Sequence, residues 1–271
     1  MRTPIVVTHG AATHTGLRRT LNEDSFVATA PLFFVADGMG GHEAGDVAST
    51  AVVESFCPLV GRTSITLDDL RFALARARAT IDGLGADGES RAGTTLTGVA
   101  VASVDGTGYW LVVNIGDSRT YRLTGAGLER LTIDHSVVQE LIDAGEIDES
   151  DAHDDRRRNI ITRAIGAGSA GEADYWMVPA EVGDRILVCS DGLSSEVPDL
   201  LLREILRTNT DPQRAAEQLI ARALAQGGRD NITAIVVDAV HVSVRPEGAA
   251  DEESDIDSDT RPREEAMGGA R

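Results

Sequence analysis

The chain carries two kinds of hydrophobic pattern, which together predict a domain of mixed α and β structure. Continuous or alternating apolar runs predict strands over residues 4–12, 25–30, 32–37, 95–104, 109–116, 119–124, 185–192 and 232–240. Apolar residues at helical spacing predict helices over residues 44–55, 66–84, 136–145, 198–208 and 211–228. Because the strands come in blocks and do not alternate one by one with helices, the order favours antiparallel sheets covered by helices, an α+β fold.

The C-terminal segment differs in composition from the rest of the chain. From Arg245 onward it holds nine acidic residues against four arginines and almost no large apolar residues. Such a segment cannot bury enough apolar surface to fold by itself. We therefore expect a folded domain over residues 1–245 and an acidic, disordered tail over residues 246–271.

Composition and charge restrict the class of protein. The 271 residues are 42% hydrophobic, enough for a large core, and the net charge of −19 argues against nucleic-acid binding, which needs a basic surface. No apolar run reaches the ~20 residues of a membrane-spanning helix, and the start lacks the apolar segment of a signal peptide. Two distant cysteines form no disulfide framework. We expect a cytoplasmic monomer with no membrane or nucleic-acid partner.

Acidic residues stand at the ends of five predicted strands. They are Glu23, Asp24, Asp37, Asp117, Asp191 and Asp230, the last followed by Asn231. If these ends meet at one edge of the sheets, the carboxylates gather there, and they repel one another unless a cation offsets them. Oxygen ligands suit Mg²⁺ or Mn²⁺. An Asp can also simply begin a turn, but the same arrangement at five places favours a metal site.

Residues near these acids suggest phosphate chemistry. Gly38 could let the backbone turn sharply, so that its carbonyl faces an ion. Arg19 lies beside the strand end at Glu23 and could bind phosphate oxygens through two hydrogen bonds; the alternative is a surface charge. His42 is either a general acid near neutral pH or a residue that stabilises the glycine turn. His135 is expected to help begin a helix.

Two other chemistries are disfavoured by spacing. The two cysteines lie far apart and the six histidines show no paired spacing, so the chain lacks the ligand pattern of a zinc site. No GxSxG sequence surrounds Ser118 or Ser190, which argues against a serine-nucleophile hydrolase. The chemistry indicated by the residues alone is therefore that of a Mg²⁺ or Mn²⁺ site with an adjacent arginine.

Eight stretches, in this order, resemble the motif series of the protein phosphatase 2C family, the metal-dependent serine/threonine phosphatases, in its bacterial form. They are RRTLNEDS, VADGMGGHEAGDVAS, GTTLTGVAV, NIGDSRTYRL, LTIDHS, NIITRAIG, RILVCSDGL and GGRDNITAIVV. The resemblance extends over about residues 5 to 240. The resemblance implies a four-layer αββα sandwich, in which two antiparallel sheets are flanked by helices, with a binuclear Mg²⁺ or Mn²⁺ centre at one edge.

The resemblance also implies roles for the acids. Asp37 would bridge the two ions, the Gly38 carbonyl would bind one, and Asp191 and Asp230 would bind the other. Asp117 together with Asp191 matches a weaker third site in bacterial members.

Other matching positions would act around the ions. Glu23 and Asp24 would hold metal-bound waters, Asn231 would support Asp230, and Arg19 would bind the substrate phosphate. Animal members place their general acid two residues after the bridging Asp, where this chain has Met39, so the proton donor is left open between His42 and a water. Residues 144–163 match a mobile flap of bacterial members.

The implied activity is hydrolysis of phosphoserine and phosphothreonine in proteins, by direct attack of a metal-bridging hydroxide, in opposition to a bacterial Ser/Thr kinase. One alternative is a phosphatase of anti-sigma-factor antagonists, but the first motif begins close to Met1 and leaves no room for a sensor domain. A pseudophosphatase that only binds phosphoproteins is disfavoured because Asp37, Asp191 and Asp230 are present. A small-molecule phosphatase would need a closed pocket.

Overall fold

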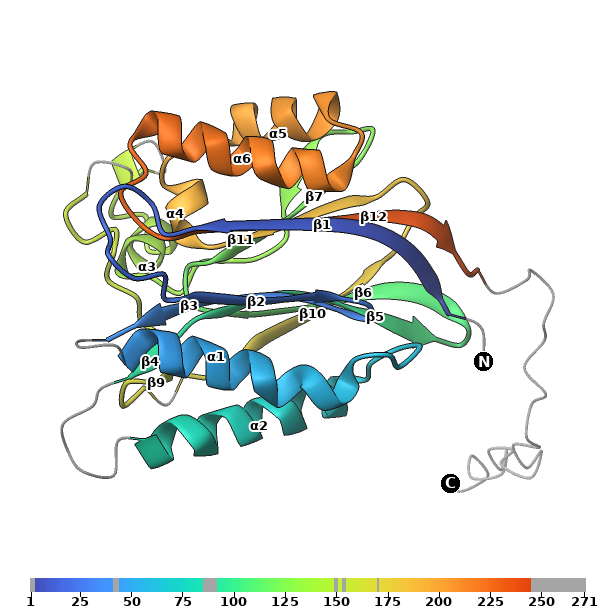
Figure 1. Ribbon diagram of the computed structural model, residues 1–271, viewed down its shortest axis with the longest axis horizontal. Helices are drawn as coiled ribbons and strands as arrows, with labels where there is room; N and C mark the ends of the chain where they lie inside the picture. Colours follow the sequence, from blue (N-terminus) through green and yellow to red (C-terminus); the bar gives the residue numbers. More distant parts are fainter. Residues whose placement is uncertain are drawn as a thin grey trace, which may run out of the picture.

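Two antiparallel sheets lie face to face in the computed structural model, which describes residues 3–40, 44–84, 92–148, 151–152, 155–169 and 171–244 (Figure 1). The first sheet has the order β1-β12-β11-β7-β8 and comprises β1 (Ile5–His14), β7 (Arg119–Leu123), β8 (Leu128–Arg130), β11 (Arg185–Cys189) and β12 (Ile232–Val242). The second has the order β10-β6-β5-β3-β4-β9, with β2 paired to β3, and comprises β2 (Asp24–Thr29), β3 (Leu32–Met39), β4 (Gly93–Thr94), β5 (Leu96–Val104), β6 (Thr107–Ile115), β9 (Ile165–Gly166) and β10 (Asp174–Pro179).

Helices cover the outer face of each sheet. On the second sheet lie α1 (Ala44–Phe56) and α2 (Leu67–Leu84), joined by the short 3₁₀ helix η1 (Cys57–Leu59), and on the first lie α5 (Asp199–Thr208) and α6 (Pro212–Gln226). Two short helices, α3 (Val137–Asp143) and α4 (Asp191–Ser194), lie at one end of the sandwich. This arrangement confirms the predicted four-layer αββα sandwich.

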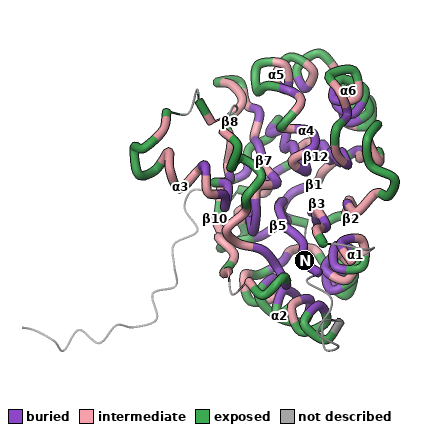
Figure 2. Tube along the Cα trace, turned by 90° about the vertical axis from the view of Figure 1, so that its left-hand side faces the viewer, coloured by how far each residue is buried: buried purple, intermediate pink, exposed green. Residues whose placement is uncertain are grey.

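The continuous apolar run of β3 is explained by burial on both faces of its sheet. Successive strand side chains point to opposite faces, so Phe33 packs between the two sheets, whereas Phe34 packs under α1, with Phe56 in edge contact. The third core lies between the first sheet and α5 and α6. Figure 2 shows these buried strands between the exposed outer faces of the helices. Three apolar cores thus hold four layers together.

The predicted strands and helices are all present, with shifted ends, but several short elements were missed. The strand β10 has mostly half-exposed side chains at the sheet edge, so its pattern is weak. The run over residues 185–192 was predicted as strand throughout, whereas the strand ends at Cys189 and α4 begins at Asp191. Within the described residues, no helix combines the length and apolar character needed to cross a membrane. The tail and its boundary lie outside the described residues.

Candidate functional site

Strand pairing brings the acidic strand ends together at one end of the sandwich. Asp24 lies directly opposite Asp37 in the β2–β3 pair. Asp117 lies in the connection from β6, in the second sheet, to β7, in the first, while Asp191 opens α4 and Asp230 precedes β12. Four of these acids, Asp37, Asp117, Asp191 and Asp230, line a cleft of about 230 Å³, whose lining also includes Arg19, Glu23, Gly38, Met39, Thr95 and Asn159. Both sheets therefore contribute acids to one cleft.

Two glycines allow the backbone segments around the cleft to touch. A Cβ atom on Gly192 would overlap the carbonyl oxygen of Asn231, so the start of α4 lies against the segment that carries Asp230. A Cβ on Gly38 would overlap the carbonyl of Gly45. Gly38 is still paired within β3, so it does not form the sharp turn that was expected there. Glycine is required at this position because a side chain would have no space.

Burial and mutual repulsion raise the pKa values of the clustered acids. Burial is the largest cause of the raised pKa of Asp37, and Asp24 and Asp191 add to it. Burial also raises the pKa of Asp117, followed by the charge of Asp191, and the pKa of Asp191, followed by the charge of Asp230. Carboxylic acids held in this way lose protons readily only if positive charge is brought beside them. The cluster is thus an electrostatic match for cations.

Asp24 lies beneath the cleft and has one unused oxygen. Its Oδ2 accepts hydrogen bonds from Ser190 Oγ at 2.8 Å and Thr233 Oγ1 at 2.7 Å. Its buried Oδ1 has no partner among the described residues. Burial raises the pKa of Asp24 to about 7, although the two hydroxyls lower it. An unpaired buried carboxylate oxygen is costly, and a metal-bound water beside it would remove that cost.

The donor set fits Mg²⁺ or Mn²⁺. The acidic side chains that line the cleft and the backbone carbonyl of Gly38 offer oxygen, the ligand atom that these ions prefer. Within the described parts of the chain, no three acidic, histidine or cysteine side chains already stand together as a ready group of ligands. Without cations the carboxylates repel one another, so we expect them to stand apart. The side chains would therefore move a short distance to bind the ions.

Arg19 lies at the mouth of the cleft. Its Nη2 donates to Asp230 Oδ2 at 2.8 Å, and its side chain is 52% exposed. The hydrogen bond with Asp230 is the main cause of the raised pKa of Arg19. The guanidinium thus points its charge at the acid cluster and keeps donors accessible from solvent.

Asn231 fastens the loop that carries Arg19 and Glu23. Its side-chain nitrogen donates to the carbonyls of Thr15 and Leu21, each at 2.9 Å, and its Oδ1 accepts from the Glu23 backbone at 2.8 Å. Its own backbone N–H donates to Asp230 Oδ1 at 2.8 Å. Asn231 was expected to support Asp230, and it contacts Asp230 through its backbone N–H. Its side chain instead holds the loop in place. Burial raises the pKa of Glu23.

The structure adds Thr95, which sequence reasoning did not single out. Thr95 Oγ1 accepts from the backbone N–H of Asp37 at 3.0 Å and lies 2.9 Å from Ser118 Oγ, and its own N–H donates to the Asp37 carbonyl at 2.9 Å. It therefore ties Asp37 to the turn that follows Asp117. A threonine within a strand gives no sequence signal for such a contact.

The role of His135 differs from the predicted one, which was to help begin a helix. Ser136, not His135, caps α3 by accepting from the Gln139 N–H. His135 is buried, and its Nδ1 accepts from the Gly116 N–H at 3.1 Å while its Nε2 lies 2.9 Å from Asp174 Oδ2. It therefore holds the turn that precedes Asp117.

Two further predictions concern the rim of the cleft. His42 lies outside the described residues, whereas Met39 lines the cleft. The described parts of the segment 144–163 return to the site through Asn159 and Ile161, which line it. The segment is fastened at its base, where the Thr162 N–H donates to the His135 carbonyl at 2.8 Å.

A four-layer sandwich with acids gathered at the adjoining ends of its two sheets is the arrangement that the sequence motifs predict for a metal-dependent phosphatase. The Protein phosphatase 2C family model matches residues 17–235, and the chain belongs to this family.

Named relatives and solved structures agree with this assignment. The chain is 38% identical over 216 residues to the serine/threonine phosphatase stp of Listeria monocytogenes, covering 77% of this chain and 84% of that protein. It superposes on the crystal structure of the Mycobacterium tuberculosis serine/threonine phosphatase PstP/Ppp with a TM-score of 0.81 and 37% identity, covering 88% of this chain and 100% of that one. A structure of the PstP catalytic domain in complex with 2 manganese ions gives a TM-score of 0.76 and 36% identity, with coverage of 88% and 100%.

Proposed function

We propose that the chain hydrolyses phosphoserine and phosphothreonine in proteins and that the acidic cleft is its active site. The observation that carries the proposal is the convergence of Asp37, Asp191 and Asp230 with Arg19 at one cleft, in a chain that belongs to the protein phosphatase 2C family. The cleft is open to solvent and lined by polar groups, which suits a phosphate carried on a protein surface better than a small enclosed molecule.

The site would hold two divalent ions, Mg²⁺ or Mn²⁺. Asp37 would contact both, the Gly38 carbonyl one, and Asp191 and Asp230 the other. Support comes from the all-oxygen donor set, from the raised pKa values of Asp37 and Asp191, and from the similar PstP structure that holds 2 manganese ions. Such ions supply an activated water for attack on phosphorus and neutralise charge on the phosphate oxygens.

The chain's own residues would prepare this chemistry. Arg19 would bind the phosphate oxygens through its exposed donors, leaving Asp230 to the ions. Asp24, through its unpaired Oδ1, and Glu23 would accept hydrogen bonds from waters around the ions. Asp117 would form a weaker third site with Asp191. The proton for the leaving group would come from a water near Asp117 or from His42.

We further propose that the protein acts as a cytoplasmic monomer, with phosphorylated Ser/Thr proteins as substrates and a bacterial Ser/Thr kinase as the enzyme it opposes. The folded domain would comprise residues 1–245, and the tail would be dispensable for the reaction. A chain that ends at Arg245 should therefore fold and hydrolyse p-nitrophenyl phosphate at the normal rate.

A phosphothreonine peptide assay tests the activity directly. Turnover is expected with Mn²⁺ or Mg²⁺, should vanish in EDTA and should return when the ion is restored. The variant Asp37→Asn should lose roughly three decades in rate, because it removes the carboxylate shared by both ions. Undiminished turnover by metal-free enzyme would contradict the metal-dependent mechanism. Turnover of p-nitrophenyl phosphate but of no phosphopeptide would favour the small-molecule alternative.

A further inference from the structure

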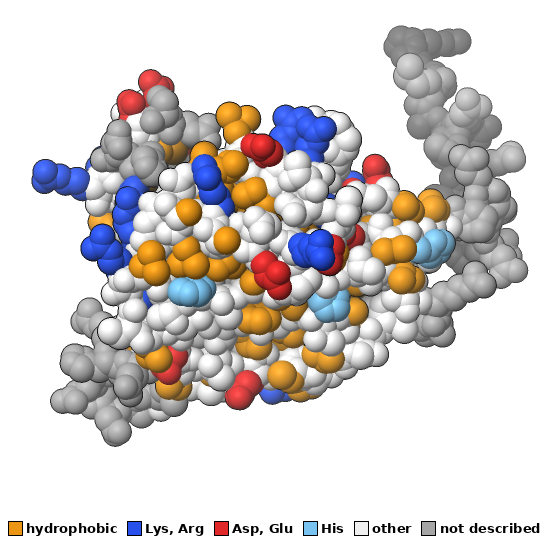
Figure 3. Space-filling model, turned by 45° about the horizontal axis from the view of Figure 1, so that its top comes forward, with side chains coloured by type: hydrophobic (Ala, Val, Ile, Leu, Met, Phe, Trp, Pro, Cys, Tyr) orange, Lys and Arg blue, Asp and Glu red, His pale blue; other side chains and the backbone are white. Residues whose placement is uncertain are grey.

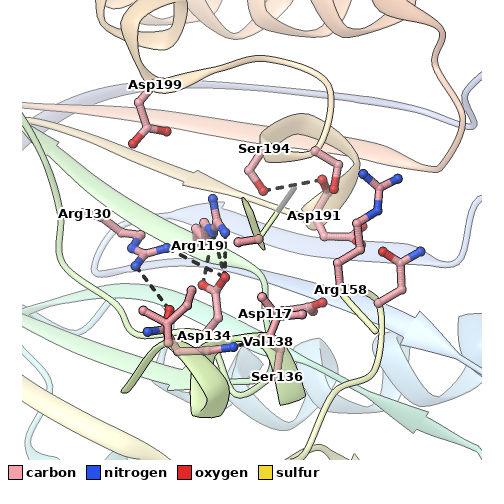
Figure 4. Close-up of a pocket in the computed structure, with 15 residues that line it drawn as sticks. Asp117, Arg119, Arg130, Asp134, Ser136, Val138, Arg158, Asp191, Ser194 and Asp199 are labelled. Atoms are coloured by element: carbon pink, nitrogen blue, oxygen red, sulfur yellow. Dashed lines mark hydrogen bonds and ion pairs between the residues drawn. The ribbon is translucent and has the colours of Figure 1, made fainter. Parts of the chain in front are cut away.

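A second cavity adjoins the acidic cleft and extends it toward β8 and α5. Its volume is about 530 Å³, larger than that of the cleft itself. The two share Asp117, Asn159 and Asp191 in their linings. The far side of the cavity is formed by polar side chains that the proposed reaction does not use, among them Arg119, Arg130, Asp134, Gln139, Ser194 and Asp199 (Figure 4).

Two arginines in this cavity share one carboxylate unequally. Arg119 is fully engaged with Asp134, through its Nη2 at 2.6 Å and its Nε at 3.0 Å from each carboxylate oxygen. Arg130 reaches the same carboxylate only at 3.8 Å, and its other contact is to Gln139 Oε1 at 3.5 Å. At these distances Arg130 makes no short hydrogen bond with any of the residues described. A guanidinium has five N–H donors, so those of Arg130 remain available to a ligand.

Arg130 also faces the cavity in an accessible position. It ends β8, the edge strand, where it pairs with Tyr121 of β7, so its backbone is fixed. Its side chain is 26% exposed, and Figure 4 shows its guanidinium beside Asp134 on the cavity wall. A ligand group entering the cavity can therefore reach its donors without rearrangement of the fold.

The charges on the cavity wall favour the binding of an anion once the acidic cleft holds metal ions. Asp117 and Asp191 would be committed to metal ions. On the remaining wall Arg119 is paired with Asp134, so Arg130 is left as a guanidinium without a short ion pair among the described residues. Figure 3 shows several basic side chains at the left-hand end of the molecule, the end at which the tip of β3 lies in Figure 1.

We propose that this cavity receives the residues that flank the phosphorylated residue, and that Arg130 selects an acidic group among them, either an Asp or Glu carboxylate or a second phosphate. The proposal rests on the proposed function of the adjoining cleft. An extended peptide advances ~3.3 Å per residue, so a side chain within a few residues of the reacting phosphate can enter the cavity. Arg130 is then a specificity determinant and takes no part in the bond-breaking step.

Matched phosphothreonine peptides test the proposal. In each pair, Glu or Gln stands at one flanking position, and the position is moved along the peptide. At one or more positions the wild type should favour Glu by about three- to tenfold in kcat/KM, mainly through KM, and added salt should reduce the preference. A third set with phosphoserine at the favoured position distinguishes the two anions, because the larger charge of phosphate should give the larger preference.

Variants assign the preference to one side chain. In Arg130→Gln the ratio of Glu to Gln peptides should fall to near one, whatever the absolute rates, and Arg130→Lys should keep part of it. Arg76→Gln, which removes an exposed arginine from α2 on the other side of the sandwich, should keep all of it. Equal turnover of both peptides by wild type, or an unchanged ratio in Arg130→Gln, would overturn the proposal. Absence of turnover of every peptide would instead count against the proposed function.

Discussion

Asp24 is buried beneath the cleft with one oxygen accepting from Ser190 and Thr233 and the other without a partner among the described residues. At the scale of single residues, the site is therefore built at a cost to the fold, because burial raises the pKa of Asp24, Asp37, Asp117 and Asp191. Perturbed acids in a cleft are typical of functional sites. Each side chain around them can be tested for its own contribution.

Arg19 can be separated from the ion ligands by mutation. Arg19→Ala should lower kcat/KM by about 10- to 100-fold, since a charge-assisted contact to phosphate is lost. Because Arg19 pairs with Asp230 in the structure, its removal should leave Mn²⁺ binding unchanged or slightly tighter. Kinetics and calorimetric titration check this, with Arg18→Ala, at an adjacent exposed arginine, as the matched control. An unchanged kcat/KM would assign Arg19 to the surface.

Asp117 is expected to serve the reaction without being needed for tight ion binding. Asp117→Ala should keep two tightly bound ions and the fold, yet lose about a hundredfold or more in kcat, because proton transfer to the leaving group would be impaired. If Asp117 only stabilises its turn, the variant should instead melt at a lower temperature with nearly normal kcat. Ion stoichiometry, melting temperature and kcat measured on this variant decide between the two roles.

At the scale of elements, periodicity predicted the strands that place the acids but not the contacts between them. The apolar run into Asp37 is readable because β3 is buried on both faces. The strand β10 could not be recognised in the sequence, because its half-exposed side chains at the sheet edge give no clear hydrophobic pattern. The loop contacts of Asn231 join residues about 210 positions apart, and no local pattern records such a distance. Strand ends therefore reveal candidate ligands, whereas the residues that hold them in place require the fold.

The contact between α4 and β12 can be tested through its glycine. Gly192→Ala would push α4 away from the Asn231 carbonyl and so move Asp191 relative to Asp230. We expect the melting temperature to fall by roughly 2–10 °C, with weaker Mn²⁺ binding and lower kcat. Gly83→Ala, in α2 with open space around the added Cβ, is the control and should be neutral or stabilising. Normal ion binding in Gly192→Ala would show that the close approach does not position the acids.

At the scale of the whole molecule, the acid cluster links the two halves of the sandwich. Asp24 and Asp37 belong to the second sheet, whereas Asp191 and Asp230 adjoin strands of the first, and the core between the sheets lies behind them. Without cations, the carboxylates repel one another across the junction of the sheets. With cations, the same residues would connect the sheets, so ion binding should stabilise the complete fold and not the cleft alone.

The stability of the metal-free protein should decrease as the pH rises, because its buried acids hold protons in the folded state. The folded-state pKa of Asp24 is about 7, raised from 3.8, so the folded chain retains a proton that the unfolded chain has released. Its stabilising contribution is present below about pH 4 and is lost as the pH rises through about 7. Asp37, Asp117 and Asp191 are shifted in the same direction.

In EDTA, the melting temperature of the wild type should therefore fall from about pH 5 to pH 8, and it should fall less in Asp24→Asn, whose amide cannot titrate. At neutral pH, Mn²⁺ at about 100 times its dissociation constant should add roughly 2.7 kcal/mol, or about 5–10 °C for a chain of this size. Calorimetry or fluorescence melting across pH, with and without Mn²⁺, measures both effects. If wild type and Asp24→Asn lost stability in parallel, the raised pKa of Asp24 would not be a source of the pH dependence. If Mn²⁺ gave no increase at neutral pH, the acids would not be joining the two sheets through bound cations.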